Sequence, residues 1–316
     1  QGAICIATID GALWVSHLRR KPGAGDRTLK LPASQVLAAA GADLGGEQVL
    51  ELSTVIDASD GYQEISSRII GDRAYLYFNF YNGAMGADQC LRLRDAYLEL
   101  TKLDVSTIVL MGGEDFWSNG IHLNLIEAAD SPADESWRNI NAMNDLTQAI
   151  IETTDKFTVA VLRGNAGAGG VFMALAADYV VANEGVILNP HYKGMGNLYG
   201  SEYWTYLLPK RIGETAARQI TQQRLPMGVD EAKALGLIDQ TIDTGFSASV
   251  GAQGDDRFSS ALNRALCEHA STKDFDSFIA SKQLQRKQDE AQKPLAQYRA
   301  EELERMKLNF YGFDPS

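Results

Sequence analysis

Four glycines in one short turn are the feature of this sequence best suited to chemistry. Gly164, Gly167, Gly169 and Gly170 follow an apolar run at residues 157–162 and lead into a helix of small residues. The first turn of a helix leaves its N–H groups without intrahelical partners, and glycine lets a ligand approach them closely. Such a turn can hold an anion or a developing oxyanion. A tight strand-to-helix connection with close packing explains the same glycines equally well.

Common nucleotide-binding and nucleophile motifs do not fit this part of the chain. A dinucleotide fingerprint counted from Gly167 and Gly169 would need glycine where Phe172 stands, and no Lys-Ser or Lys-Thr pair follows to form a phosphate loop. The segment FWSNG lacks the first glycine of a nucleophile elbow, because Phe116 occupies that position. Ser118 is therefore a weak candidate for a nucleophile.

Alternating strand and helix patterns must position the glycine turn. β-rich runs at 63–70 and 73–80 flank Gly71-Asp72, which predicts a hairpin. Buried strands are expected at 107–111, 157–162 and 179–182. Helices are expected at 86–102, after Ser131-Pro132, at the end of the segment 189–213, at 229–239, at 256–271 and at 274–309, the last interrupted at Pro294. Residues 244–256 are expected to form a flexible loop.

The first 60 residues differ from the rest in their pattern of predicted elements. Two strands at 4–9 and 12–15, a basic loop at 19–30 and a short helix at 31–40 indicate the end of a preceding domain. The chain opens with Gln1 in the middle of an apolar pattern, so we expect a fragment of a longer protein. The predicted domains are 1–60, with a linker, and 61–316.

Composition excludes several classes of function. Lys plus Arg number 29 against 41 for Asp plus Glu, and the net charge of -12 argues against a nucleic-acid partner or an anionic membrane surface. Cys5, Cys90 and Cys267 form no CxxC pair, which disfavours a disulfide framework or a zinc knuckle and favours the reducing cytoplasm. The sequence shows neither a transmembrane run nor a signal-peptide pattern.

Two strand-to-loop transitions, at 112–120 and 164–170, together make a family resemblance visible. The pair resembles the crotonase, or enoyl-CoA hydratase/isomerase, superfamily, whose loops read G-x-x-x-x-F-x-A-G-x-D and G-x-x-x-G-G-G. The match extends from residue 63 to about 240, with FNFYNGAM and VDEAKALGLID in the places of two further family segments. The resemblance implies an α/β fold, a crotonase-like spiral of ββα units.

The resemblance also implies a site. Two main-chain N–H groups, mapped onto Asn119 and Gly169, would form an oxyanion hole around the thioester carbonyl of a coenzyme A substrate. Segment 79–85 aligns with the family's nucleotide-contacting segment, and its candidate coenzyme A contacts are Asn79, Asn82, Gly83, Ala84 and Met85. The implied carrier is coenzyme A, and no metal is called for.

Departures from the family pattern restrict the chemistry. Where hydratases carry two glutamates that activate water, this chain has Phe172 and His191, and where relatives have aspartate after the first loop glycine it has His122. Phenylalanine cannot move a proton, and a neutral histidine is a different base in a different setting. Addition of water across a double bond is therefore not expected.

A closer resemblance is to the C-terminal half of a hydrogenase maturation family in which a formyltransferase is fused to a crotonase-like domain. Three segments carry it, GGEDFWSNGIHLNLIE, NPHYKGMGNLYGSEYWTYLLPKR and LNFYGFD, and DGALWVSHLRR resembles the formyltransferase's C-terminal module. The resemblance implies that the absent half uses formyl-tetrahydrofolate to make formyl-CoA. The half present here would split formyl-CoA into carbon monoxide and CoA for the hydrogenase iron centre, which makes the maturation machinery a candidate partner.

Splitting formyl-CoA needs a base near the formyl C–H, stabilisation of the carbonyl oxygen and a proton donor for the thiolate. The polar stretch 189–206 suggests Tyr192 and Glu202 as the proton-transfer pair, although a lone Tyr or Glu is as often structural. His191 and Tyr199 would shape the pocket, with Phe172 beside them. Trp117 and His122 are further lining candidates, for which packing is the better explanation.

Two other functions remain compatible with the sequence. One is a conventional hydratase, isomerase or hydrolase acting on the thioester of a larger acyl group. The other is a non-catalytic module that binds coenzyme A and presents its partner domain to the hydrogenase machinery. Turnover of crotonyl-CoA would favour the first of these, and tight CoA binding without turnover of any thioester would favour the second.

Overall fold

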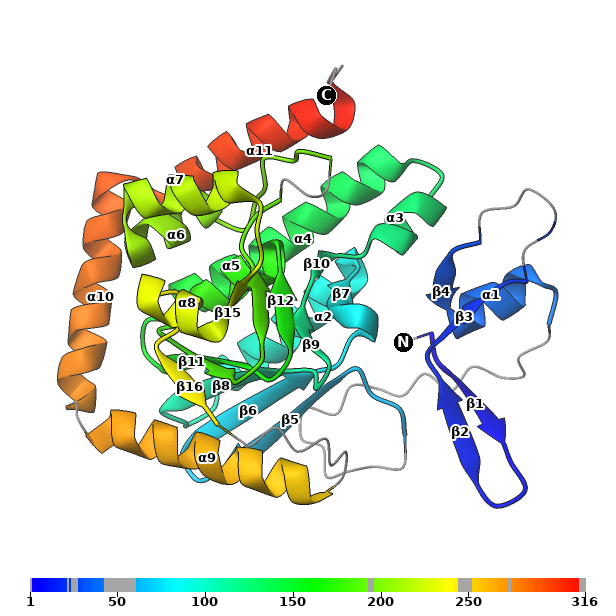
Figure 1. Cartoon of the computed structure of the whole chain (residues 1–316), viewed down its shortest axis with the longest axis horizontal. Coiled ribbons are helices and arrows are strands. Elements are labelled where there is room, and N and C mark those ends of the chain that lie inside the picture. Colours follow the sequence, from blue (N-terminus) through cyan, green and yellow to red (C-terminus); the bar gives the residue numbers. More distant parts are fainter. Residues whose placement is uncertain are drawn as a thin grey trace.

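A six-stranded sheet forms the centre of the protein (Figure 1). The computed structural model describes residues 2–21, 23, 28–42, 61–192, 196–243, 252–271 and 274–312. The strands of this six-stranded sheet run in the order β16-β13-β11-β8-β6-β5. Their bounds are β5 Ile65–Ile70, β6 Arg73–Phe78, β8 Thr107–Gly112, β11 Phe157–Leu162, β13 Tyr179–Asn183 and β16 Gln240–Ile242. Within this sheet only β5 and β6 pair antiparallel, and their pairing confirms the predicted hairpin around Gly71-Asp72.

A four-stranded sheet lies beside the first one and carries the glycine turn (Figure 1). Its order is β15-β14-β12-β9, with β9 Phe116–Ser118, β12 Asn165–Gly167, β14 Ile187–Asn189 and β15 Met227–Gly228. Two very short strands, β7 Ala84–Met85 and β10 Gly120–Ile121, pair in parallel beside it. Both predicted strand-to-loop transitions therefore lead from the large sheet into the small one, because β8 precedes β9 and β11 precedes β12.

Helices pack the space between and around the sheets. The bounds are α2 Ala87–Thr101, α3 Leu123–Ala128, α4 Pro132–Glu152, α5 Gly169–Leu175, α6 Trp204–Ile212, α7 Glu214–Gln223 and α8 Val229–Leu235, with the 3-10 turn η1 at Tyr81–Gly83. Ser131 is the N-cap of α4, as its sequence predicts, and its hydroxyl accepts the Asp134 N–H at 3.5 Å. Gly236 ends α8 in the left-handed region with φ of 86°. The sequence analysis predicted α6 at the end of segment 189–213 and missed α3 and α7.

Three C-terminal helices follow one another around the outside of the sheets (Figure 1). They are α9 Ala252–Ser271, α10 Phe275–Gln292 and α11 Leu295–Tyr311, and the break at Pro294 agrees with the sequence. Most of the predicted loop 244–256 and the last residues of the LNFYGFD segment lie outside the described residues. The helix α11 packs on α4, where Arg299 donates to Asp145 at 2.6 Å and to Asn141.

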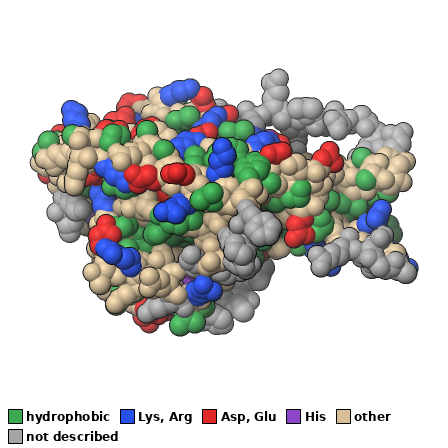
Figure 2. Space-filling view, turned by 90° about the horizontal axis from the view of Figure 1, so that it is seen from above, with side chains coloured by type: hydrophobic (Ala, Val, Ile, Leu, Met, Phe, Trp, Pro, Cys, Tyr) green, Lys and Arg blue, Asp and Glu red, His purple; other side chains and the backbone are tan. Residues whose placement is uncertain are grey.

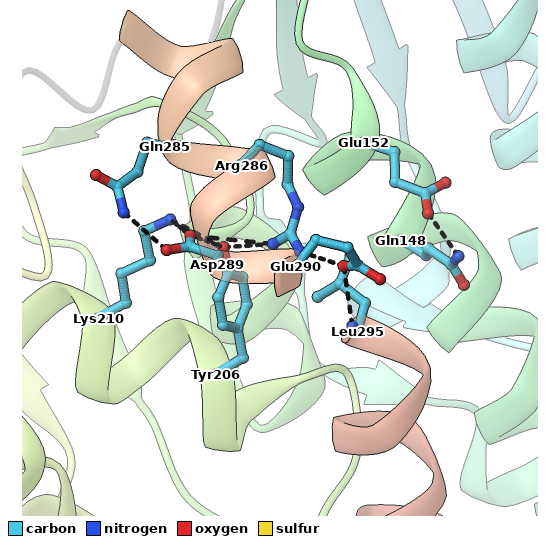
Figure 3. Close-up of polar contacts among 9 residues, drawn as sticks. All are labelled: Gln148, Glu152, Tyr206, Lys210, Gln285, Arg286, Asp289, Glu290 and Leu295. Atoms are coloured by element: carbon cyan, nitrogen blue, oxygen red, sulfur yellow. Dashed lines mark hydrogen bonds and ion pairs between the residues drawn. The ribbon is translucent and has the colours of Figure 1, made fainter. Parts of the chain in front are cut away.

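A polar cluster fastens α10 to α6 (Figure 3). The Tyr206 hydroxyl donates to Asp289 Oδ2 at 2.7 Å and accepts from Arg286 at 2.7 Å, while Lys210 forms an ion pair with Asp289. Gln285 donates to the other oxygen of the same carboxylate. Asp289 is mostly buried, so its partners would lose a shared acceptor if it were removed.

We expect Asp289→Ala to lower the free energy of unfolding by about 2 kcal/mol, because it leaves several half-buried donors without their acceptor. The exposed pair of Lys102 with Glu99 provides the control. Glu99→Ala should cost less than about 1 kcal/mol, since exposed ion pairs contribute little. Urea unfolding of both variants measures the difference, and equal losses would contradict the structural role given to the cluster.

Residues 2–42 form a small unit of hairpins and one helix. The strands β1 Ile4–Ala7 and β2 Ala12–Val15 pair antiparallel, and α1 spans Ala33–Ala39, as the sequence predicts. The two ends of the predicted basic loop, Arg19 and Lys30, belong instead to strands β3 His17–Arg19 and β4 Lys30–Pro32, which pair with each other, and residues 22 and 24–27 lie outside the described residues. The predicted domain boundary at residue 60 lies outside the described residues.

Charges of both signs intermingle over the face of the protein seen in Figure 2. Among the described residues, no helix is long and apolar enough to cross a membrane.

Candidate functional site

Two turns meet at the start of α5. Gly120, in β10, has φ of 79°, and a Cβ atom at this position would lie 3.4 Å from Gly169 N. Gly169 is the first residue of α5, so its N–H belongs to the helix turn that has no intrahelical acceptors. The first loop and the glycine turn are thus brought into contact, as the sequence predicts from their separate strand-to-loop transitions.

The glycines of the turn serve different purposes. A Cβ atom at Gly164 would lie 2.3 Å from Asp115 O, and one at Gly170 would lie 2.1 Å from Ser118 O. At these two positions the packing explanation is sufficient. Gly169 differs, because a Cβ atom there would lie 2.7 Å from the carboxyl carbon of Glu202, and its three nearest atoms would all belong to that carboxyl group. Gly169 therefore keeps space for a carboxyl group at the helix start.

Trp117 fastens the first loop to the glycine turn. It is 1 % exposed, and its indole N–H donates to Gly170 O at 2.9 Å. Its ring packs edge-on against Phe78 at 5.0 Å. The side chain that the sequence suggested for pocket lining holds β9 against α5.

Asn119, the other predicted oxyanion-hole donor, makes two hydrogen bonds within the protein. Its main-chain N–H donates to Gly83 O at 2.7 Å, and its side-chain amide donates to Asn82 O at 2.8 Å. The Gly120 N–H in turn donates to Ser118 Oγ at 3.1 Å. In this structure the Asn119 main-chain N–H is therefore occupied by Gly83, and its place in an oxyanion hole stays a prediction.

Tyr192 and Glu202 are brought together as the sequence predicts. The Tyr192 hydroxyl hydrogen-bonds to Glu202 Oε2 and also donates to Ser201 O at 2.9 Å. Both side chains are buried, with 7 % and 1 % of their surface exposed. Burial raises the pKa of Glu202 to about 7, and burial with the Glu202 charge raises the pKa of Tyr192 well above its ordinary value. A carboxyl group with a pKa near neutrality is suited to both accepting and releasing a proton.

Aromatic rings fix the position of Tyr192. Phe172, in the place of the hydratase glutamate, is fully buried and stacks on the Tyr192 ring at 5.4 Å. Gly200 has φ of 97°, and a Cβ atom there would come within 2.1 Å of the same ring. Tyr199 packs instead against Trp204 at 5.4 Å, and His191 is buried, which lowers its pKa. His191 is therefore neutral near pH 7.

His122 lies at the contact with residues 2–42. It caps α3, where its Nδ1 accepts the Leu125 N–H at 3.3 Å, and its ring stacks with His17 at 6.0 Å. The ring of His17 also stacks on Tyr81 at 4.4 Å. Both histidines line a cavity of about 350 Å³ between the small unit and the start of α2. Burial lowers the pKa of both rings, and that of His17 falls to about 4.

The candidate CoA-contacting segment 79–85 lies directly beside the first loop. Asn79 and Asn82 are exposed, Ala84 is half-buried, and Gly83 accepts the Asn119 N–H. Met85 is completely buried, which does not favour its assignment as a coenzyme A contact in this conformation. Its carbonyl accepts the Asn139 side-chain N–H at 3.0 Å. The two asparagines are therefore the accessible side chains of this segment.

Two residues that the sequence did not suggest hold the main chain at Glu202 and Tyr203. Asn144, on α4, accepts the Glu202 N–H at 2.7 Å, and Glu302, on α11, accepts the Tyr203 N–H at 2.9 Å. A signal for Glu302 was present, because it shares a helical stripe with buried Leu295 and Met306. A carboxyl group on the apolar side of a helix is rarely buried without a partner.

Two buried carboxyl groups make stability depend on pH. Burial raises the pKa of Glu202 to about 7 and, with the Glu202 charge, that of Glu302 to about 8, from 4.5 in an unfolded chain. Between about pH 5 and pH 8 the folded state holds protons that the unfolded state releases, so stability falls as pH rises.

We expect the free energy of unfolding to fall across this window by up to roughly 1 kcal/mol per pH unit for each group. Glu202→Gln combined with Glu302→Gln should flatten the dependence, whereas Glu99→Gln at the exposed ion pair should leave it unchanged. Urea unfolding at several pH values measures the slope. A slope that persists in the double variant would place the responsible groups elsewhere.

The described residues contain no group of three or more His, Cys, Asp or Glu side chains arranged to hold a metal ion. Glu202 and Tyr192 offer a carboxyl and a phenol, which can move protons, and Gly169 offers a helix N–H, which can stabilise negative charge.

Two adjoining sheets of mainly parallel strands, with a glycine turn that places a helix start beside a buried carboxyl group, define a crotonase-type α/β protein. The chain belongs to the enoyl-CoA hydratase/isomerase family, whose sequence model matches residues 87–245. This result confirms the predicted crotonase-like fold.

Individual relatives are more similar over the whole chain. It is 51% identical over 316 residues to the hydrogenase maturation factor HoxX of Bradyrhizobium diazoefficiens, covering all of this chain and 52% of that protein. The crystal structure of HypX from Aquifex aeolicus in complex with tetrahydrofolic acid superposes with a TM-score of 0.87 at 43% identity, covering 99% of this chain and 53% of HypX. The chain thus spans about half the length of these relatives. The crystal structure of an enoyl-CoA hydratase from Bacillus halodurans shares the fold, with a TM-score of 0.65 at 20% identity. That superposition covers 79% of this chain and 96% of the hydratase.

Proposed function

We propose that this protein releases carbon monoxide from formyl-CoA, leaving free CoA, as a step in the maturation of a hydrogenase. The observation that carries the proposal is the buried Tyr192–Glu202 pair, whose carboxyl group lies against Gly169 at the start of α5. Phe172 supports it, because it fills the place of a water-activating glutamate and packs on Tyr192.

The chain's own groups supply each proton transfer in a redox-neutral reaction. Ionised Glu202 takes the formyl proton, the C–H electron pair stays on carbon as the lone pair of carbon monoxide, the C–S bond breaks toward sulfur, and an oxygen lone pair completes the C≡O bond. The Tyr192 hydroxyl gives its proton to the thiolate and regains one from Glu202 through their hydrogen bond. The Gly169 N–H stabilises charge on the carbonyl oxygen. The net result is transfer of the formyl proton to sulfur, so the pair returns to its starting state.

The relatives support the biological setting of the proposal. HoxX is named as a hydrogenase maturation factor, and HypX has been crystallised with tetrahydrofolic acid. We infer that residues 2–42 are the end of a formyl-transferring half, which would use tetrahydrofolate to make the formyl-CoA. His17, in this segment, stacks with His122 directly after the first loop, so the segment lies next to that loop. Asn79 and Asn82 are the proposed side-chain contacts for CoA.

Release of carbon monoxide tests the proposal directly. The protein supplied with formyl-CoA should convert added reduced haem protein to its carbonyl form, followed by its absorbance, while free thiol accumulates in equal amount. Acetyl-CoA is the matched control, because it has no formyl hydrogen. Folded protein that binds CoA but forms no carbonyl spectrum would overturn the proposal. In that case, turnover of crotonyl-CoA would indicate a conventional thioester enzyme, and absence of any turnover a binding module.

A further inference from the structure

A carboxyl group that the proposed reaction does not use is buried behind the site. Glu302, on α11, is 0 % exposed, and both of its oxygens accept hydrogen bonds. Oε2 accepts the Tyr203 N–H at 2.9 Å, and Oε1 accepts the Thr205 N–H at 2.9 Å and the Thr205 hydroxyl at 2.5 Å. These donors belong to the start of α6, so Glu302 caps that helix from a distant part of the chain.

The segment that Glu302 holds is in an unfavourable conformation. Glu202 and Tyr203 have φ of 62° and 57°, in the left-handed region that is unfavourable for a residue other than glycine. Such a conformation persists only where surrounding contacts impose it. Here each N–H has its own clamp, Asn144 of α4 for Glu202 and Glu302 of α11 for Tyr203.

The helix α11 holds the neighbouring residues in the same way. Gly200 N–H contacts Met306 Sδ at 3.1 Å, and the Tyr199 N–H donates to Asn309 Oδ1 at 3.0 Å. One face of α11 carries all three of these side chains, because Glu302, Met306 and Asn309 are spaced by four and three residues. This face therefore contacts main-chain N–H groups between residues 199 and 205. Of these three, only Glu302 carries a charge.

We propose that Glu302 is a positioning residue, which holds the Glu202 carboxyl against Gly169 and Tyr192 by clamping the left-handed turn at 202–203. It touches the main chain on the far side of Glu202 and would not touch substrate. Without it, the turn is free to relax toward ordinary backbone angles, and the Glu202 side chain leaves its place beside Gly169.

Glu302 also affects the protonation of Glu202, because it keeps that carboxyl group buried. The titratable groups facing Glu202 are Tyr192, Cys90 of α2 and Glu302, and those facing Glu302 are Glu202 and the hydroxyls of Tyr192, Tyr199 and Tyr203. Glu202, with a pKa of about 7, ionises before Glu302, with a pKa of about 8, and burial is what raises the pKa of Glu202. A Glu202 carboxyl group released from its buried place should therefore titrate at lower pH.

Two variants with one control test this inference, which rests on the proposed function only for its kinetic part. Glu302→Ala removes the clamp, Glu302→Gln keeps one acceptor oxygen and removes the charge, and exposed Glu301→Gln is the control. We expect Glu302→Ala to lower kcat for carbon monoxide release at least tenfold with KM within twofold, and Glu302→Gln to recover part of the rate. In Glu302→Ala, the Glu202 carboxyl signal in a ¹³C-glutamate NMR titration should move to lower pH because the group becomes more exposed, and in Glu302→Gln it should move less, with Glu202→Gln identifying the signal.

Each outcome decides between a positioning and a merely structural role. If both variants keep the parent's kcat and the parent's Glu202 titration, the inference is overturned. If Glu302→Ala does not fold, Glu302→Gln alone carries the test through its pH dependence. If the parent forms no carbon monoxide, the proposed function fails, while the shift of the Glu202 titration still tests whether Glu302 controls that carboxyl group.

Discussion

Glu202→Gln is expected to lower the rate of carbon monoxide release by about 10²–10³-fold, because general-base catalysis by one placed group contributes on that order. Glutamine keeps the size of the side chain and an oxygen that can accept the Tyr192 hydrogen bond, so the packing around it should persist. It cannot take the formyl proton. Stopped-flow formation of the haem carbonyl measures the rate, and calorimetry with CoA should give the parent's affinity.

The pH dependence adds a second check on Glu202. Since burial raises its pKa to about 7, the fraction present as carboxylate, and with it the rate, should rise between about pH 6 and pH 8. Tyr192→Phe should lower the rate without removing this rise, because phenylalanine retains the stacking on Phe172 and lacks only the hydroxyl. Parent-like rates in both variants would remove the pair from the mechanism.

Short-range patterns made much of the fold predictable. The hairpin at Gly71-Asp72, the buried strands and the N-cap at Ser131 depend on residues within a few positions of one another. The meeting of the two loops was also predictable, since each follows a parallel strand of one sheet. The pairing of Tyr192 with Glu202 was suggested only because a dense polar stretch stands where the family keeps its acids.

Long-range contacts explain what the sequence did not reveal. Asn119 was assigned as a donor by alignment, but its N–H is used by Gly83, 36 positions earlier in the chain, which no local pattern reports. Glu302 reaches the site across 100 positions, from a helix whose register is set by packing on α4. The strands β3 and β4 pair through residues that read as a basic loop, because charged ends of short strands carry little periodicity.

Substitution of two adjacent glycines should separate the function of the turn from its packing. A methyl group at Gly169 would meet the Glu202 carboxyl at 2.7 Å, which can move, whereas one at Gly170 would meet Ser118 O at 2.1 Å, which cannot. We expect Gly169→Ala to leave the free energy of unfolding within about 1 kcal/mol of the parent, since alanine is tolerated at a helix start. The rate should fall about 10²-fold, because both the acid and the N–H donor are displaced from the carbonyl.

Gly170→Ala should show the opposite pattern in the same two measurements. Forcing main chain apart in a packed interior costs about 1–3 kcal/mol or more, so the urea midpoint should drop, while the protein that remains folded should retain activity closer to that of the parent. The comparison is sharp because the two positions are consecutive and the added group is the same. If Gly169→Ala kept full activity, the carboxyl at Gly169 would have no part in the chemistry, and the packing explanation of the turn would suffice for all of its glycines.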